Sequence, residues 1–267
     1  MKTKPKMKAK LVKALKEIYD EREATNIADY YVDAMRGQDV KDIDNHLKQL
    51  SEGQPVQYVT NTSFFYDYKL YVNEHTLIPR PETEELVHWV VADNKHSKFS
   101  ILDIGTGSGC IILSILKKCN GATGTGIDVD NNVKEVFDIN ASRLDVVADF
   151  ITLDFLDKTT WEGLPKYNII ASNPPYIAKE EVERLGTNVL AHEPHLALFT
   201  NGDPLIFYRR TLEFAVDHMD EGGKVYFETS DLYDKEMRAL AEEFDLKYEY
   251  RKDMQGAWRM LKLWRND

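Results

Sequence analysis

The chain is poor in cysteine and has no long apolar runs. Its 267 residues include only Cys110 and Cys119, without a histidine cluster nearby, so we expect neither a disulfide framework nor a metal site. No stretch approaches the roughly 18 consecutive apolar residues that a membrane span needs. The lysine-rich start is not followed by the apolar segment of a secretion signal. These absences predict a cytoplasmic protein without a membrane partner.

The chain also lacks an excess of basic residues. The sequence has 45 Asp and Glu residues against 34 Lys and Arg, which gives a formal net charge of -11. A surface that holds nucleic acid phosphates over a long footprint is usually basic, so the composition disfavours a nucleic acid partner. The hydrophobic content of 43% fits a globular protein with one large domain, or with a large and a small one.

The first 80 residues divide into two patterns. Residues 1–53 carry apolar stripes at helical spacing, with Asp39 as an expected N-cap of the third helix. We interpret this segment as a small helical domain that docks the substrate, since it precedes every cofactor residue proposed below. Residues 54–80 are rich in aromatic and β-branched residues, including Tyr58 and Val59, and predict a β-hairpin linker.

From residue 81 to residue 267, short apolar runs alternate with helical patterns. We predict strands within residues 101–104, 123–127, 150–153, 169–171 and 225–227. Such alternation is typical of βαβ units on a parallel sheet. The last two runs, residues 246–250 and 257–264, are separated by a short turn and predict an antiparallel hairpin at the sheet edge. The fold class is therefore α/β.

A glycine-rich segment follows the first of these strands, Gly105-Thr106-Gly107-Ser108-Gly109. Glycines at a strand-to-helix turn let the backbone approach a ligand, and the helix start offers N–H groups to an anion or carboxylate. Asp128 ends the next strand, where a carboxylate can accept hydrogen bonds from two ribose hydroxyls. Phe155 follows the third strand and offers a flat face to an adenine ring, although a core position suits it equally. A dinucleotide site and a plain tight turn both stay open.

A second segment, Asn173-Pro174-Pro175-Tyr176, follows the predicted strand at 169–171. A planar NH2 group attacks an electrophile only if acceptors hold its N–H bonds, because its lone pair is delocalised. The Asn side-chain oxygen supplies one acceptor. The prolines lack N–H groups and fix φ, so they hold a backbone carbonyl outward, while the Tyr ring can cover a flat substrate. The alternative is a rigid turn at the end of the strand.

The order of these segments resembles that of S-adenosylmethionine-dependent methyltransferases. This resemblance implies a Rossmann-like, seven-stranded sheet with an antiparallel last strand, which the terminal hairpin matches, and S-adenosylmethionine as cofactor. A nicotinamide-dependent dehydrogenase would share the glycine segment and the ribose acid but has no use for a cradle that holds an amide.

Two further segments narrow the resemblance to the HemK/PrmC family, the glutamine N5-methyltransferases of class I peptide chain release factors. They are Leu77-Ile78-Pro79-Arg80-Pro81-Glu82-Thr83-Glu84 and Ala191-His192-Glu193-Pro194-His195-Leu196-Ala197-Leu198. Taken alone, Arg80 and Glu82 also fit an ordinary surface ion pair. Two features depart from the family pattern: Phe155 stands where tryptophan also occurs, and Glu228-Thr229-Ser230 replaces the more frequent Glu-Ile-Gly.

The resemblance implies a role for each segment. Residues 105–109 would bind the methionine part of the cofactor, Asp128 the ribose, and Phe155 would lie beside the adenine. The substrate glutamine would be held by Asn173, Pro174, Pro175 and Tyr176, with Asn173 also next to the cofactor and with Asn173, Pro174 and Tyr176 as catalytic residues. The implied partner is a class I release factor, and we expect a monomer.

Three rival functions stay open at this point. A ribosomal-protein glutamine methyltransferase would share the Asn-Pro-Pro-Tyr segment. An adenine-N6 methyltransferase of DNA or RNA would share it too, but the acidic charge and the lack of a recognisable target-recognition domain disfavour it. A non-catalytic module that binds S-adenosylmethionine would not need the amide cradle.

Overall fold

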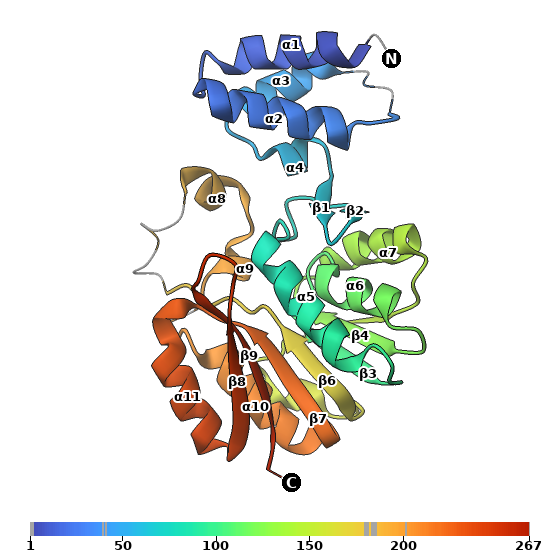
Figure 1. Ribbon diagram of the computed structural model, residues 1–267, viewed down its shortest axis with the longest axis vertical. Helices are drawn as coiled ribbons and strands as arrows, with labels where there is room; N and C mark the ends of the chain where they lie inside the picture. Colours follow the sequence, from blue (N-terminus) through green and yellow to red (C-terminus); the bar gives the residue numbers. More distant parts are fainter. Residues whose placement is uncertain are drawn as a thin grey trace.

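The computed structural model describes residues 3–38, 40, 42–178, 182, 186–200 and 202–266. Figure 1 shows a group of helices at the N-terminal end above a larger body in which helices cover a sheet. The N-terminal group consists of α1 (Thr3–Leu15), α2 (Glu21–Ala34), α3 (Ile43–Ser51) and α4 (Val56–Val59). These helices share a hydrophobic core of their own, which includes Leu11, Leu15, Ala28, Tyr31 and Leu50.

The N-terminal helices differ from the predicted elements at two points. Helix α3 is capped by Asp42, whose carboxylate accepts a hydrogen bond from the Asn45 N–H at 3.1 Å, whereas Asp39 lies outside the described residues. Tyr58 and Val59, predicted as part of a β-favouring stretch, form helix α4 instead. Val59 packs into the core of the N-terminal helices, and the Tyr58 hydroxyl donates to the Thr76 carbonyl at 2.7 Å. Tertiary contacts thus override intrinsic β-propensity here.

The short hairpin of β1 (Ser63–Phe65) and β2 (Tyr68–Leu70) follows α4. Tyr66 and Asp67 form its turn with positive φ angles of 50° and 67°. The hairpin contacts α2, because the Tyr30 hydroxyl donates to the Thr62 carbonyl at 3.2 Å and the Tyr30 ring packs edge-on against Phe64. The division of the chain near residues 53 and 80 into domains stays a proposal.

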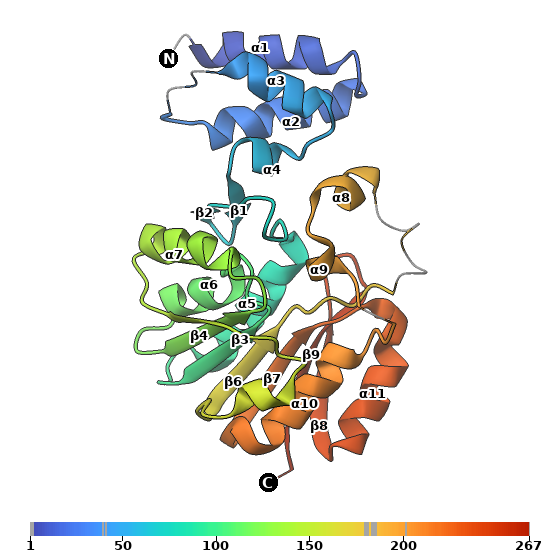
Figure 2. The ribbon, with the colours of Figure 1, turned by 180° about the vertical axis from the view of Figure 1, so that it is seen from behind.

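The larger body is built on a seven-stranded sheet in the order β5-β4-β3-β6-β7-β9-β8. Its strands are β3 (Ser100–Ile104), β4 (Thr123–Asp128), β5 (Asp149–Thr152), β6 (Tyr167–Ser172), β7 (Met219–Glu228), β8 (Leu246–Lys252) and β9 (Trp258–Arg265). Strands β3 to β7 pair in parallel, and β9 pairs antiparallel with both β7 and β8 (Figure 2). The predicted α/β class and the antiparallel terminal hairpin are confirmed.

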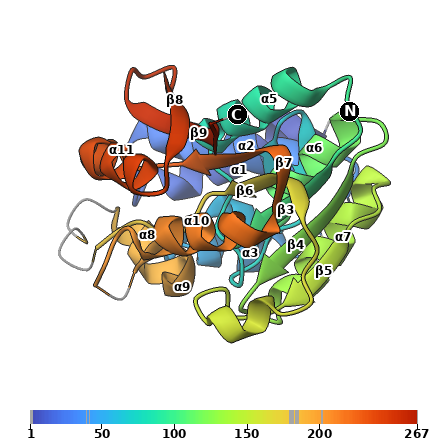
Figure 3. The same cartoon turned by 90° about the horizontal axis from the view of Figure 1, so that it is seen from below.

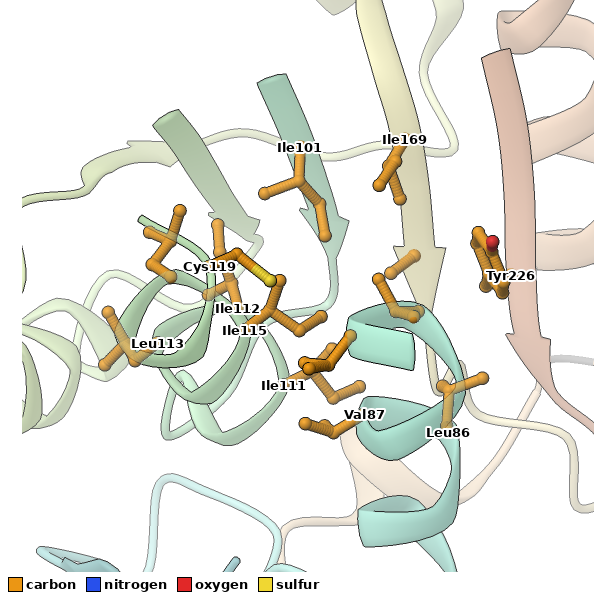
Figure 4. Close-up of a cluster of buried hydrophobic side chains, with 14 of the residues drawn as sticks. Leu86, Val87, Ile101, Ile111, Ile112, Leu113, Ile115, Cys119, Ile169 and Tyr226 are labelled. Carbon is orange, nitrogen blue, oxygen red and sulfur yellow. The ribbon is translucent and has the colours of Figure 1, made fainter. Parts of the chain in front are cut away.

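Helices cover both faces of this sheet (Figure 3). They are α5 (Pro81–Asn94), α6 (Cys110–Lys118), α7 (Val133–Leu144), α10 (Ile206–His218) and α11 (Asp234–Glu243), with short helices α8 (Thr187–His192), α9 (His195–Leu198), η1 (Lys158–Trp161) and η3 (Asp231–Tyr233). Alternate strand residues point to opposite faces. Ile169 and Tyr226 pack with α5 and α6, as Figure 4 shows, whereas Ile170 and Phe227 pack with α10 and α11.

Because both faces of the central strands are covered, residues 169–171 of β6 and 225–227 of β7 are continuously apolar and buried and do not alternate with polar residues. Within the described residues, no helix combines the length and the apolar content needed to cross a bilayer.

Candidate active site

The glycine segment forms an open loop between β3 and α6. Gly105, Gly107 and Gly109 have positive φ angles of 70°, 51° and 77°, a region that side chains disfavour. A Cβ atom on Gly105 or Gly107 would meet no atom within 4 Å, so the backbone there is accessible to a ligand. A Cβ on Gly109 would lie 2.6 Å from a methyl carbon of Leu113, so Gly109 is required by packing.

Hydrogen bonds tie this loop to the end of β4. The N–H groups of Gly105 and Thr106 both donate to the Ile127 carbonyl at 2.9 Å. The Gly107 N–H donates to Asp128 Oδ2 at 3.0 Å, so the predicted ribose acid lies directly beside the loop. Burial raises the pKa of Asp128. The structure thus brings the loop and this carboxylate together, as the sequence predicted.

Two buried residues that the sequence analysis missed support the loop. Asp103, fully buried at the end of β3, accepts a hydrogen bond from the Thr106 hydroxyl at 2.7 Å, and desolvation raises its pKa to about 7. Asn140 of α7 donates to the carbonyls of Ser108 and Tyr71, both at 2.9 Å. The position of Asp103 at a strand end was a visible signal, whereas nothing in the local sequence distinguishes Asn140.

Phe155 lies in a buried aromatic cluster. Its side chain is 5% exposed and its ring centroid is 5.3 Å from that of Trp161 and 5.5 Å from that of Phe214. This agrees with the core position that the sequence left open, and contact with an adenine stays a prediction. The neighbouring Asp154 accepts a hydrogen bond from the Leu156 N–H at 2.9 Å.

The segment Asn173-Pro174-Pro175-Tyr176 leaves the end of β6 and lines a pocket. The other residues around this pocket are Leu77, Arg80, Ile177, Ala197, Leu198 and Glu228. Burial, together with the charge of Glu228, raises the pKa of Tyr176 to about 12, so its hydroxyl is neutral near pH 7. All four predicted residues therefore share one site, and both family-like segments contribute to its wall.

Side chains from two other elements fix Asn173 in this pocket. The Asn173 amide nitrogen donates to Thr83 Oγ1 of α5 at 3.2 Å, and the Thr83 hydroxyl donates to a carboxylate oxygen of Glu228, at the end of β7, at 2.6 Å. Burial of Glu228 raises its pKa to about 7. Thr83 belongs to a segment that resembles the family, and Glu228 precedes the two departing residues, but the sequence assigned a role to neither.

An ion pair joins the two family-like segments. Arg80 binds Glu193 at 2.6 Å, and the second oxygen of this carboxylate accepts from the Ile78 N–H at 3.1 Å. The Glu193 side chain is only 2% exposed, so the pair anchors the segment around α8 and α9 beside the pocket. The suggestion of an Arg80–Glu82 surface pair was wrong, because Glu82 instead accepts from the Gln255 amide at 3.0 Å.

The departure at residues 228–230 has a structural role. Thr229 pairs with β9 through its N–H, which donates to the Arg259 carbonyl at 2.7 Å. The Ser230 hydroxyl caps η3 by accepting from the Leu232 N–H at 3.3 Å. This loop therefore ends β7 in a defined turn beside Glu228.

Known proteins resemble the chain over both its catalytic part and its full length. The methyltransferase small domain family matches residues 83–229. A release factor glutamine methyltransferase from Flavobacterium psychrophilum is 37% identical, with 96% of this chain and 97% of the relative aligned. A protein of the same name from Lactococcus lactis is 35% identical over 84% of this chain and 82% of the relative.

Solved structures agree on the fold. A ribosomal protein L11 methylase from Lactobacillus delbrueckii superposes with a TM-score of 0.54 at 16% identity, covering 73% of this chain and 84% of that one. A methyltransferase from Pyrococcus furiosus gives a TM-score of 0.53 at 17% identity, covering 82% and 97%. Sheet order, glycine loop, Asn-Pro-Pro-Tyr pocket and full-length similarity lead to one assignment: the chain belongs to the HemK/PrmC family of release factor glutamine methyltransferases.

Proposed function

We propose that the chain transfers a methyl group from S-adenosylmethionine to the side-chain amide nitrogen, N5, of the glutamine in the Gly-Gly-Gln motif of class I peptide chain release factors. The observation that carries this proposal is the fixed Asn173 amide at the rim of the pocket. The amide nitrogen of Asn173 donates a hydrogen bond to the Thr83 hydroxyl oxygen. Among the described residues, no hydrogen bond is donated to the amide oxygen. An acceptor is thus presented where a substrate NH2 group would need one.

The residues at the ends of β3 and β4 fit the cofactor. The open backbone at Gly105 and Gly107 suits the methionine part. The Asp128 carboxylate accepts from the N–H groups of Gly107 and Asp130 and keeps further acceptor capacity for ribose hydroxyls. When bound, S-adenosylmethionine supplies an electrophilic sulfonium methyl group, which the substrate nitrogen takes. Because Asp128 and the loop are tied together, they form one preorganised surface.

The residues after β6 would act on the substrate. Asn173 Oδ1 and the Pro174 carbonyl accept the two N–H bonds of the glutamine and hold its nitrogen in line with the methyl group. The nitrogen becomes positive as its new bond forms, so these acceptors bind the transition state more tightly than the ground state. The neutral Tyr176 ring covers the flat amide, and the surplus proton leaves to water.

Mass spectrometry of the reaction products tests this proposal. Purified protein, S-adenosylmethionine and a release factor should give one added methyl on the glutamine of the Gly-Gly-Gln motif. Methylation of a ribosomal protein, DNA or RNA with the release factor unmodified would replace the proposed function by one of its rivals.

A further inference from the structure

Three side chains from distant parts of the chain form a line of hydrogen bonds in the wall of the pocket. Asn173 follows β6, Thr83 lies in the first turn of α5, and Glu228 ends β7. The two links measure 3.2 Å and 2.6 Å, and both Thr83 and Glu228 are at most 3% exposed. None of the proposed steps of catalysis uses Thr83 directly.

The chemistry of the three groups gives this line a direction. An ionised carboxylate only accepts hydrogen bonds, so the single hydroxyl proton of Thr83 is directed to Glu228. The Thr83 oxygen is then left as an acceptor, which only the NH2 end of the Asn173 amide can satisfy. The oxygen end of that amide is consequently turned away from Thr83.

We infer that Thr83 is a positioning residue for methyl transfer, held by Glu228 and acting through Asn173 by fixing which end of the amide meets the substrate. This inference rests on the proposed function. A reversed Asn173 amide would present two N–H donors to the N–H bonds of the glutamine, where an acceptor is needed. Without Thr83, both orientations of the amide are accessible, and only one is productive.

The ionisation of Glu228 sets the direction of the line. The titratable groups around this carboxyl are Arg80, Glu82, Cys110, Tyr176, Tyr208 and Arg259. Burial dominates over the two arginines and raises the pKa of Glu228 to about 7. Below that pH the protonated acid can donate to Thr83, whose proton then becomes available to the Asn173 oxygen. The rate of methyl transfer should therefore fall as the pH drops below about 7, and this fall should require the Thr83 hydroxyl.

Three variants separate positioning from simple loss of structure. Thr83→Val keeps the shape and removes the hydroxyl, and Thr83→Ser keeps the hydroxyl. Thr211→Val is the matched control, since Thr211 is a buried helical threonine of α10 whose hydroxyl donates to the Phe207 carbonyl at 2.8 Å. Each is assayed for kcat and KM on a release factor, for S-adenosylmethionine affinity by calorimetry, and for melting temperature. Thr83→Ala takes the place of Thr83→Val if that variant does not fold.

Thr83→Val should lower kcat about tenfold, as expected for one lost orienting hydrogen bond, while cofactor affinity stays within about twofold. Thr83→Ser should recover most of the rate, Thr211→Val should match the wild type, and the acid-side fall of kcat should be weaker in Thr83→Val. A wild-type kcat in Thr83→Val, or equal losses of kcat in the serine and valine variants, would overturn this inference and leave the proposed function intact. A wild-type protein that leaves release factors unmodified would overturn the proposed function and this inference with it.

Discussion

The cofactor end and the substrate end of this site are held in different ways. At the cofactor end, the contacts span fewer residues: Asp128 reaches Gly107 over 21 residues, Asp103 reaches Thr106 over three and Asn140 reaches Ser108 over 32. At the substrate end, Asn173 reaches Thr83 over 90 residues, and Thr83 reaches Glu228 over 145. Backbone geometry mainly shapes the first end, with Asn140 of α7 as a supporting side chain, whereas side chains from separate elements shape the second.

This difference predicts where single substitutions act. Backbone groups supply most of the cofactor end, so Asp128 is the ligand-facing side chain there whose substitution we expect to weaken cofactor binding. At the substrate end the orientation of one amide depends on side chains of two other elements. Changes there should alter rate with little effect on cofactor affinity.

The largest effect is expected for Asn173→Ala. Loss of a preorganised group that contacts the reacting nitrogen should cost about 3 kcal/mol, or roughly a hundredfold in kcat. Calorimetry should show nearly unchanged affinity for S-adenosylmethionine. Turnover close to that of the wild type would remove Asn173 from the mechanism.

Asp128→Ala should show the opposite pattern at the cofactor end. A charged acceptor for ribose hydroxyls is worth about 2 kcal/mol, so the Kd for S-adenosylmethionine should rise roughly thirtyfold. Asp128→Asn keeps the shape of the side chain and an oxygen for the Gly107 N–H. Its Kd for S-adenosylmethionine should lie between those of the wild type and Asp128→Ala. Unchanged cofactor affinity in both variants would mean that the ribose is held elsewhere.

Each end also contains a buried acid, Asp103 or Glu228, whose pKa is raised to about 7 by desolvation. Since the folded state binds these protons more tightly than the unfolded state does, their contribution to stability is full below the ordinary carboxyl pKa. It is lost as pH rises to about 7. Glu228→Gln should reduce this loss by about 1.4 kcal/mol per pH unit within that window.

Urea unfolding of the wild type and Glu228→Gln at several pH values between about 5 and 8 measures this contribution. Parallel pH dependences of the two proteins would show that Glu228 does not titrate in that range.

The smallest effect concerns the N-terminal helices, proposed as a docking segment. Deleting residues 1–53 should raise the KM for a whole release factor about fivefold but leave a short Gly-Gly-Gln peptide nearly unaffected, since only the large partner gains a second contact. Cofactor affinity serves as the control for folding. Equal losses on protein and peptide would show that these helices support the catalytic part and do not dock the substrate.

The same contrast explains what the sequence could predict. The strands and the cofactor loop follow from local patterns, namely apolar runs, glycines at a strand end and an acid after the next strand. The Asn-Pro-Pro-Tyr segment was also visible locally. Thr83, Glu193 and Asn140 act through contacts that only the folded chain creates, so no local pattern reveals their partners. Tyr58 and Val59 were misread because their packing, and not their propensity, decides that they are helical.

The most direct test offers the protein a choice of acceptors. A release factor, its variant with the Gly-Gly-Gln glutamine replaced by asparagine, ribosomal proteins and tRNA are mixed with labelled S-adenosylmethionine, and the labelled site is mapped by mass spectrometry. We predict label on the release factor glutamine and none on the asparagine variant. Label on ribosomal protein or tRNA, with the release factor unlabelled, would contradict the account.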